Sequence, residues 1–131
     1  MLLDTSGLLC CFDADEGRHH DAVGHYQAAV RRLTHNYVLA EFVALAQARR
    51  LAREASLAFV AELAADAEIE LFWVDPVLHA EALALLQAQL DKSYSLCDAV
   101  SFVLMRRHGI VDALTTDRHF DQAGFRRLLP P

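Results

Sequence analysis

The chain has 131 residues, of which 54% are hydrophobic, with a mean hydropathy of +0.18. This length and composition fit one folded domain over residues 1–131 and argue against a disordered chain. No apolar stretch is long enough to span a bilayer, and Asp4 interrupts the apolar opening, which no basic region precedes. We therefore expect no membrane span or signal peptide, and a cytoplasmic location. The net charge of −6 is not typical of an ordinary nucleic-acid-binding protein, which usually carries a basic surface.

The first part of the chain predicts a strand followed by two helices. Leu2–Asp4 is typical of a short buried strand, and Ser6 is placed to cap a brief helix that ends near Phe12. After an acidic turn, apolar residues at helical spacing predict a helix over His19–Leu33. A very short strand over Leu33–His35 is the alternative for the end of this segment.

The middle of the chain predicts two more helices and a strand. The helices cover Tyr37–Leu51 and Leu57–Ala67, and Ser56 is the expected cap of the second. Ile69–Val74 is rich in bulky and β-branched residues, which favours a strand.

The last part of the chain has clear helix boundaries. Asp75-Pro76 pairs an N-cap residue with proline at the first helical position, so a helix should run to about Leu90. A further helix is expected over Ser95–His108, ended by Gly109. A buried strand, a short turn or helix and an edge strand should follow at Ala113–Thr116, Asp121–Gly124 and Phe125–Leu129. Strands alternating with helices indicate an α/β fold, with a mainly parallel sheet covered on both faces.

Four carboxylates stand where such a fold would bring them to one end of the sheet. Asp4 and Asp117 each close a predicted strand, and ligands of open α/β sheets bind outside the carboxyl ends of the strands. Glu41 and Asp98 lie near the starts of helices whose positive ends can point at the same crevice. Clustered anions repel one another, and burial raises that cost. A fold that gathers them needs a cation, and oxygen-only ligands suit Mg²⁺ or Mn²⁺.

Each carboxylate taken alone also has a purely structural interpretation. Asp98 completes a Ser-x-x-Asp pattern with Ser95, much like a capping box, and the others are typical strand-end, first-turn or turn residues. Their convergence favours a site, because Glu41 and Asp98 lie in apolar stretches where an unpaired charge is costly. His119 is placed to orient a substrate, although a structural role is favoured. Cys97 has no histidine placed locally to activate it and is interpreted as a core residue.

Basic residues are nearly all arginines, and they occur in clumps. Arginine binds phosphate bidentately, so a local phosphate-binding rim is one interpretation despite the acidic net charge. Helix-end arginines that complement the helix dipole are the other interpretation.

The chain resembles the PIN-domain nucleases, and within them the VapC-type toxins of toxin–antitoxin pairs, over nearly its whole length. Leu3–Ser6 is similar to the first motif of the family, and Tyr94–Phe102 is similar to its third. Leu114–Phe120, followed by Gln122–Phe125, is similar to the closing motif. Glu41 matches the second acidic position.

The resemblance implies a three-layer α/β/α sandwich and a Mg²⁺- or Mn²⁺-dependent endoribonuclease. It also implies homodimerisation, and inhibition by a cognate antitoxin whose tail covers the active groove. The acidic set that it assigns to metal binding and catalysis is Asp4, Glu41, Asp98 and Asp117. The polar positions that it assigns to supporting this set are Ser6 and Thr116.

A mechanism follows as a hypothesis from these assignments. Asp4 and Asp98 would hold a divalent ion, while Asp117 and Glu41 would hold a second ion or orient the attacking water. A metal-activated water would attack the RNA phosphodiester in line, leaving a 5′-phosphate and a 3′-hydroxyl. The arginines expected to bind flanking phosphates, in a salt-dependent manner, are Arg118, Arg49 and Arg53.

Three alternatives remain open at this point. A phosphoryl-accepting receiver domain also gathers acidic residues and Mg²⁺, but it needs a lysine after a late strand, and the only lysine, Lys92, precedes a helix. A non-catalytic module could keep the acidic pocket for an arginine of a partner. A PIN-fold nuclease could instead process RNA or cleave DNA without an antitoxin. The exposed apolar faces of the Glu41–Ala67 helices are the expected dimer surfaces.

Overall fold

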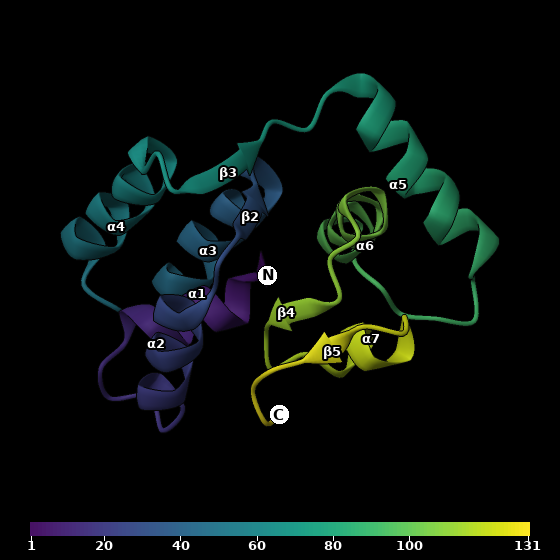
Figure 1. The fold of residues 1–131 in the computed structure, drawn as a ribbon. Coiled ribbons are helices and arrows are strands. Elements are labelled where there is room, and N and C mark those ends of the chain that lie inside the picture. The colour runs from purple at the N-terminus through teal and green to yellow at the C-terminus, as the bar shows by residue number, and fades with distance from the viewer.

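The computed structural model describes all of residues 1–131 and contains one five-stranded sheet. All of its strands are parallel, in the order β3-β2-β1-β4-β5 (Figure 1). The strands are β1 (Leu2–Leu3), β2 (Arg32–His35), β3 (Ile69–Phe72), β4 (Asp112–Leu114) and β5 (Arg126–Arg127).

Helices cover both faces of the sheet, which confirms the predicted α/β/α sandwich (Figure 1). One face carries α1 (Thr5–Phe12), α2 (His19–Ala28), α3 (Asn36–Ala48) and α4 (Arg53–Ala65). The other carries α6 (Leu96–His108) and α7 (Arg118–Gln122), with α5 (Pro76–Ala88) packed on α6.

The two faces follow from alternation along very short strands. Leu3 and Leu114 are register partners and join the core beneath α1 and α3. Leu2 and Ala113 are also partners and join the core beneath α6 and α7. Successive strand residues point to opposite faces, so two apolar residues in a row are enough to anchor both layers.

The strand order reverses direction beside β1. The chain runs outward from β1 to β2 and β3, and then returns to β4 on the other side of β1. This reversal is a topological switch point, where open α/β sheets bind ligands at the carboxyl ends of the strands. The order differs from the 2-1-3-4-5 arrangement of receiver-type folds, which removes that alternative.

The predicted helix over His19–Leu33 is too long. It ends at Ala28, where Ala29 turns to an extended conformation, and Val30 is fully exposed. Leu33 is instead buried in β2, paired with Leu2 of β1. The helical spacing was accidental at this end, because burial in the sheet decides the conformation of Leu33; the alternative short strand is confirmed.

Some helix boundaries also differ from the predicted ones. Ser56 does not cap α4 but lies inside it, where its hydroxyl donates to the carbonyl of Arg53. Ser6 likewise lies within α1, whose N-cap residue is Asp4. The helix α7 begins before the predicted turn because Asp117 caps it. The expected boundaries of α5 and α6 are confirmed.

Gly7 allows α1 to pass directly over β4. A Cβ atom at Gly7 would lie 2.0 Å from the carbonyl oxygen of Leu114, so only glycine fits this contact. The contact brings the start of α1 against the end of β4, and both ends carry polar residues. No helix of the chain is both long and apolar enough to cross a membrane.

Candidate active site

Asp4 lies at the end of β1 and is only 4% exposed. One of its carboxylate oxygens accepts a hydrogen bond from the Thr115 hydroxyl at 2.7 Å, and the Ser6 hydroxyl lies 3.3 Å from the same oxygen. The backbone N–H of Asp4 donates to the carbonyl of Leu114 at 3.2 Å. These contacts attach the first acidic residue to the end of β4.

Thr115 is the centre of a hydroxyl network that joins β1 and β4. Its Oγ1 donates to Asp4, lies 3.0 Å from the Ser6 hydroxyl and accepts from the backbone N–H of Asp117. Thr116, the expected supporting residue, takes part through its backbone N–H, which donates to Ser6 Oγ at 2.9 Å. The hydroxyl function therefore belongs to Thr115, which is completely buried, rather than to Thr116.

Asp98 serves both as a helix cap and as a member of the cluster. Its backbone N–H donates to the Ser95 hydroxyl, and its Oδ2 accepts from the backbone N–H of Ser95, each at 3.0 Å. These reciprocal bonds form the capping box that the sequence indicated. The same Oδ2 lies 3.1 Å from Nδ1 of His119, so the capping role leaves this carboxylate in contact with the cluster.

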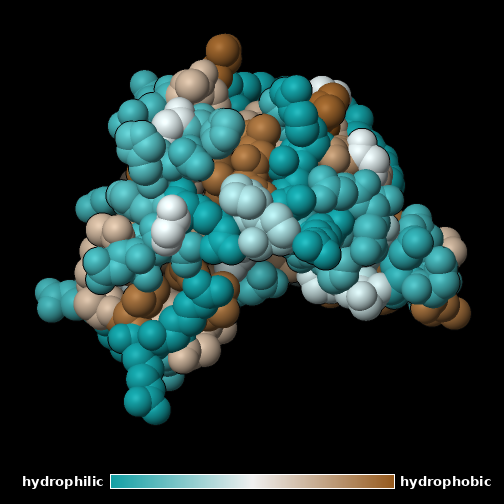
Figure 2. Space-filling view, turned by 90° about the horizontal axis from the view of Figure 1, so that it is seen from below, coloured by the Kyte–Doolittle hydropathy of each residue, from teal (hydrophilic) through white to brown (hydrophobic).

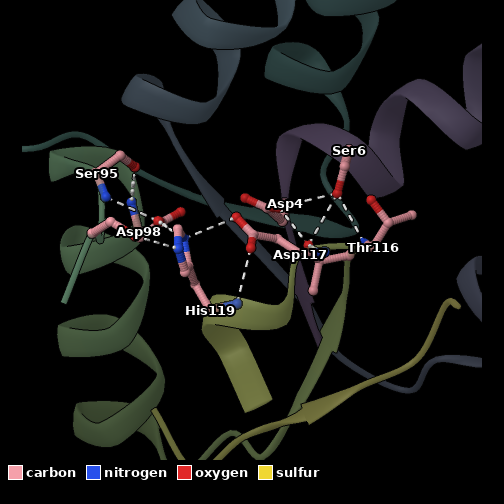
Figure 3. A network of polar contacts seen from close by, with 9 residues as sticks. Asp4, Ser6, Ser95, Asp98, Thr116, Asp117 and His119 are labelled. Carbon is pink, nitrogen blue, oxygen red and sulfur yellow. Dashed lines mark hydrogen bonds and ion pairs between the residues drawn. The ribbon is translucent and has the colours of Figure 1, made fainter. Parts of the chain in front are cut away.

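His119 connects Asp98 to Asp117. Its Nδ1 lies 3.3 Å from Oδ2 of Asp117, while its backbone N–H donates to the other oxygen of that carboxylate at 2.9 Å. Figure 3 shows the imidazole between the two carboxylates, with Asp4 on the far side of Asp117. Donor atoms of Asp98, Asp117 and His119 lie within 4.8 Å of one another, so these three side chains are where an ion could bind.

Glu41 joins the cluster electrostatically from α3. Burial is the main cause that raises the pKa of Asp4 and of the Cys97 thiol, and the negative charge of Glu41 adds to both shifts. The side chain is exposed and lies outside the group of close donor atoms formed by Asp98, Asp117 and His119. The structure thus brings three of the expected acids into direct contact networks and places the fourth beside them.

Burial and mutual repulsion perturb the carboxylates of the cluster. Burial, which the Thr115 hydrogen bond opposes, and the charges of Asp98 and Glu41 raise the pKa of Asp4 to about 7. Burial also raises the pKa of Asp98, and the charge of Asp117 adds to this effect. Hydrogen bonds from Ser95 and His119 oppose the shift of Asp98, so the chain compensates these gathered charges only in part.

The residues present fit a divalent cation. No lysine or arginine forms an ion pair with Asp4, Glu41, Asp98 or Asp117, and His119 is the only basic side chain within 4 Å of two of them. Carboxylate oxygens are the preferred ligands of Mg²⁺ and Mn²⁺. Cys97 is buried, and burial raises the pKa of its thiol, which confirms its interpretation as a core residue rather than a nucleophile.

The arginines expected to bind phosphate lie at two different places. Arg118 directly follows Asp117, is exposed and forms no ion pair, so it borders the cluster. Arg49 and Arg53 follow the C-terminal end of α3, and Arg53 donates to Gln47. The rise of a helix places Arg49 about 12 Å along the axis from Glu41. Only Arg118 is adjacent to the acidic side chains.

The sequence interpretation missed Thr115, and for His119 it favoured a structural role over the orientation of a substrate. Thr115 was counted as a buried strand residue, although a hydroxyl at the carboxyl end of a strand beside Asp117 was the signal that could have identified it. The contact between His119 and Asp98 joins α7 to α6 and has no local signature.

Comparison with known proteins identifies the family. The PIN domain matches residues 1–126. The chain belongs to the PIN-domain family. This chain is similar to the 23S rRNA-specific endonuclease VapC20 of two Mycobacterium tuberculosis strains. The two sequences are 30% identical over 131 residues, which cover 99% of this chain and 98% of the relative. The crystal structure of Mycobacterium tuberculosis VapC20, described as a Sarcin-Ricin loop cleaving toxin, superposes with a TM-score of 0.88 at 29% identity and 98% coverage of both chains. This chain is therefore a homologue of a VapC-type toxin endoribonuclease.

Proposed function

We propose that this PIN-domain chain is a Mg²⁺- or Mn²⁺-dependent endoribonuclease and the toxin of a toxin–antitoxin pair. One observation carries the proposal: acidic side chains from the end of β1, the start of α6 and the end of β4 gather at one edge of the sheet without a lysine or arginine partner. The same fold, over nearly the same length, belongs to a protein described as an RNA-cleaving toxin.

The chain supplies ligands, rigidity and orientation. Asp4, Asp98 and Asp117 would hold the ion, and Glu41 would hold a second ion or orient the attacking water. A bound divalent ion lowers the pKa of water and offsets the negative charge of the scissile phosphate. Thr115 and the capping box fix two of the carboxylates before substrate binds, so that little reorganisation is required during the reaction.

RNA with an exposed, structured loop is the proposed substrate class. The VapC20 relatives are named for 23S rRNA and for the sarcin-ricin loop, and this chain covers them almost completely. Sequence-specific recognition of RNA mostly targets single-stranded loops, whose unstacked nucleotides are accessible to side chains at the edge of a sheet. Arg118 is placed to contact a phosphate next to the one that is cleaved.

The cleavage test uses ribosomes and protein-free rRNA as separate substrates. In chelator no cleavage is expected, and added Mg²⁺ or Mn²⁺ should restore it, with a 5′-phosphate and a 3′-hydroxyl at the cut. Mapping the ends by primer extension shows whether one loop is selected. Undiminished cleavage in chelator contradicts the metal-dependent mechanism, and cleavage of DNA but not RNA favours the nuclease without an antitoxin.

The proposed partners are a cognate antitoxin and a second copy of the chain, in the cytoplasm. The antitoxin is expected to be encoded next to this chain and to suppress cleavage when it is mixed with the protein at equal concentration. Light scattering of the purified chain measures the oligomeric state. A monomer at all concentrations contradicts the homodimer, and it leaves the nuclease proposal in place.

A further inference from the structure

We propose that His119 supplies a nitrogen ligand to the divalent ion, beside carboxylate oxygens of Asp98 and Asp117. The ligand role rests on the divalent-ion site proposed above and makes it more specific. The centre is then a mixed nitrogen–oxygen site, in contrast to the oxygen-only site that the four carboxylates predict.

The spacing of the donor atoms supports direct ligation. Nδ1 of His119 lies 3.1 Å from Oδ2 of Asp98 and 3.3 Å from Oδ2 of Asp117. An octahedral ion with bonds of about 2.1 Å holds adjacent ligand atoms about 3.0 Å apart. The imidazole nitrogen is therefore already at the distance that two ligands of one ion keep from each other.

The ring of His119 is held in the orientation that a ligand requires. Its Nε2 lies 3.1 Å from the Ser93 hydroxyl, and the ring packs edge-to-face on Tyr94 with the centroids 5.4 Å apart. Histidine ligands in proteins almost always donate their other ring N–H to a hydrogen-bond acceptor, and the Ser93 hydroxyl, which can donate or accept, is able to take that part. Nδ1 is also at hydrogen-bond distance from Asp98, so ligation requires the tautomer with the hydrogen on Nε2, in which Nδ1 presents its lone pair toward the carboxylates.

The remaining bond fixes the ring relative to one carboxylate. The backbone N–H of His119 donates to Oδ1 of Asp117, which leaves Oδ2 turned toward Nδ1. Asp117 and His119 therefore move as a unit at the start of α7, and Asp98 is fixed independently by its capping box. Two rigid elements thus hold the three donor atoms.

A nitrogen ligand changes the choice of metal. Imidazole binds Mn²⁺ and later transition metals more strongly than it binds Mg²⁺, whereas carboxylates suit Mg²⁺ and Mn²⁺ alike. We therefore expect this chain to bind Mn²⁺ more tightly than Mg²⁺, and His119 should carry most of the difference.

Pulsed EPR of the Mn²⁺-loaded, full-length chain tests the ligand directly, without reference to activity. The wild-type spectrum should show coupling to a directly bound ¹⁴N nucleus, and ¹⁵N-labelled histidine should convert that coupling to the ¹⁵N pattern. Mn²⁺ that is bound without any nitrogen coupling overturns the inference, and metal-dependent cleavage would then still stand. Failure to bind Mn²⁺ at all overturns the proposed ion site as well.

Substitution gives an independent measurement by competition between the two metals. His119→Asn should lower Mn²⁺ affinity by at least about 10-fold, since even partners outside the ligand shell contribute that much. Mg²⁺ affinity should fall less, so the Mn²⁺ preference should shrink. His20→Asn, on the exposed face of α2, is the matched control and should change neither affinity. An equal loss of affinity for both metals in His119→Asn overturns the nitrogen-ligand role.

Discussion

Asp4 links the proposed ion site to the stability of the protein at the scale of a single residue. The pKa of Asp4 in the fold is about 7, against an ordinary value of 3.8, because the carboxylate is buried. Between these values the folded state binds more protons than the unfolded state, so the contribution of Asp4 to the free energy of unfolding decreases as pH rises. Without metal, the ionised form of Asp4 destabilises the protein above pH 7.

Asp4→Asn removes that pH-dependent destabilisation. In chelator at pH 8, the variant should have a free energy of unfolding roughly 2–4 kcal/mol above that of wild type, and at pH 4 the two should be similar. Urea denaturation followed by circular dichroism at the two pH values measures the difference. Asp15→Asn, in an exposed loop, is the control and should show no such trend. A constant difference between Asp4→Asn and wild type at both pH values contradicts the assigned role of burial.

Asp98→Asn separates the capping role of this residue from its proposed catalytic role. The amide keeps an oxygen that can accept from the backbone of Ser95 but loses the charge that an ion requires. Cleavage should fall at least about 100-fold, while the free energy of unfolding changes by no more than about 1 kcal/mol.

Asp75→Asn is the matched control for Asp98→Asn, because Asp75 also caps a helix and accepts from the backbone N–H of Leu78, outside the cluster. It should lose comparable stability without loss of cleavage. Normal cleavage by Asp98→Asn would leave the cap as its only role.

At the scale of elements, the contact between α1 and β4 determines whether the site forms. Gly7 is where the two backbones meet, and the residues on either side of the contact include Asp4 and Thr115. A change at Gly7 should therefore reach the site through the backbone, without altering any polar side chain.

Gly7→Ala forces α1 away from β4, because the added methyl group would lie 2.0 Å from a backbone oxygen. We expect a loss of stability of about 1–3 kcal/mol from this overpacking, and weaker metal binding because Asp4 moves from Thr115. Gly24→Ala, in the middle of α2 with nothing within 4 Å of the added atom, should instead stabilise by about 0.5–1 kcal/mol. Thermal unfolding of the two variants measures both effects, and equal behaviour of the two contradicts the close-contact interpretation.

Elements with local signals could be predicted from the sequence, and those determined by distant contacts could not. The capping box at Ser95, the Asp75-Pro76 start of α5 and the Gly109 end of α6 each depend on a few neighbouring residues, and each was predicted. The end of α2 was misplaced because Leu33 is recruited by β1, and Gly7 was overlooked because its partner is more than a hundred residues away. The four acids could be selected because strand ends and helix starts share one edge of a parallel sheet.

At the scale of the whole molecule, more than half of the arginines form ion pairs with carboxylates. The face in Figure 2 is mainly hydrophilic, with smaller hydrophobic patches. An arginine that already pairs with a carboxylate has to exchange that partner for a phosphate, so the arginines without a partner are the first candidates for RNA binding. The arginines that pair with a carboxylate are Arg18, Arg31, Arg32, Arg107, Arg126 and Arg127.

Arg118 is therefore expected to provide a large share of the phosphate contact near the site. The Asp98→Asn protein should not cleave RNA, so its binding to an RNA loop can be measured separately from cleavage. Fluorescence anisotropy over a range of salt concentrations then reports the phosphate contacts. Adding Arg118→Ala should weaken binding for all loop sequences alike, and should reduce the slope of log affinity against log salt by about 1. Arg107→Ala is the control, because Arg107 already pairs with Glu81 on the exposed side of α5 and α6, and its loss should leave the slope unchanged.

An unchanged slope in the Arg118→Ala protein would mean that the phosphates are bound elsewhere. The group around Arg49 and Arg53 would be the next to test, since neither forms an ion pair and both lie on the face that carries α3 and α4.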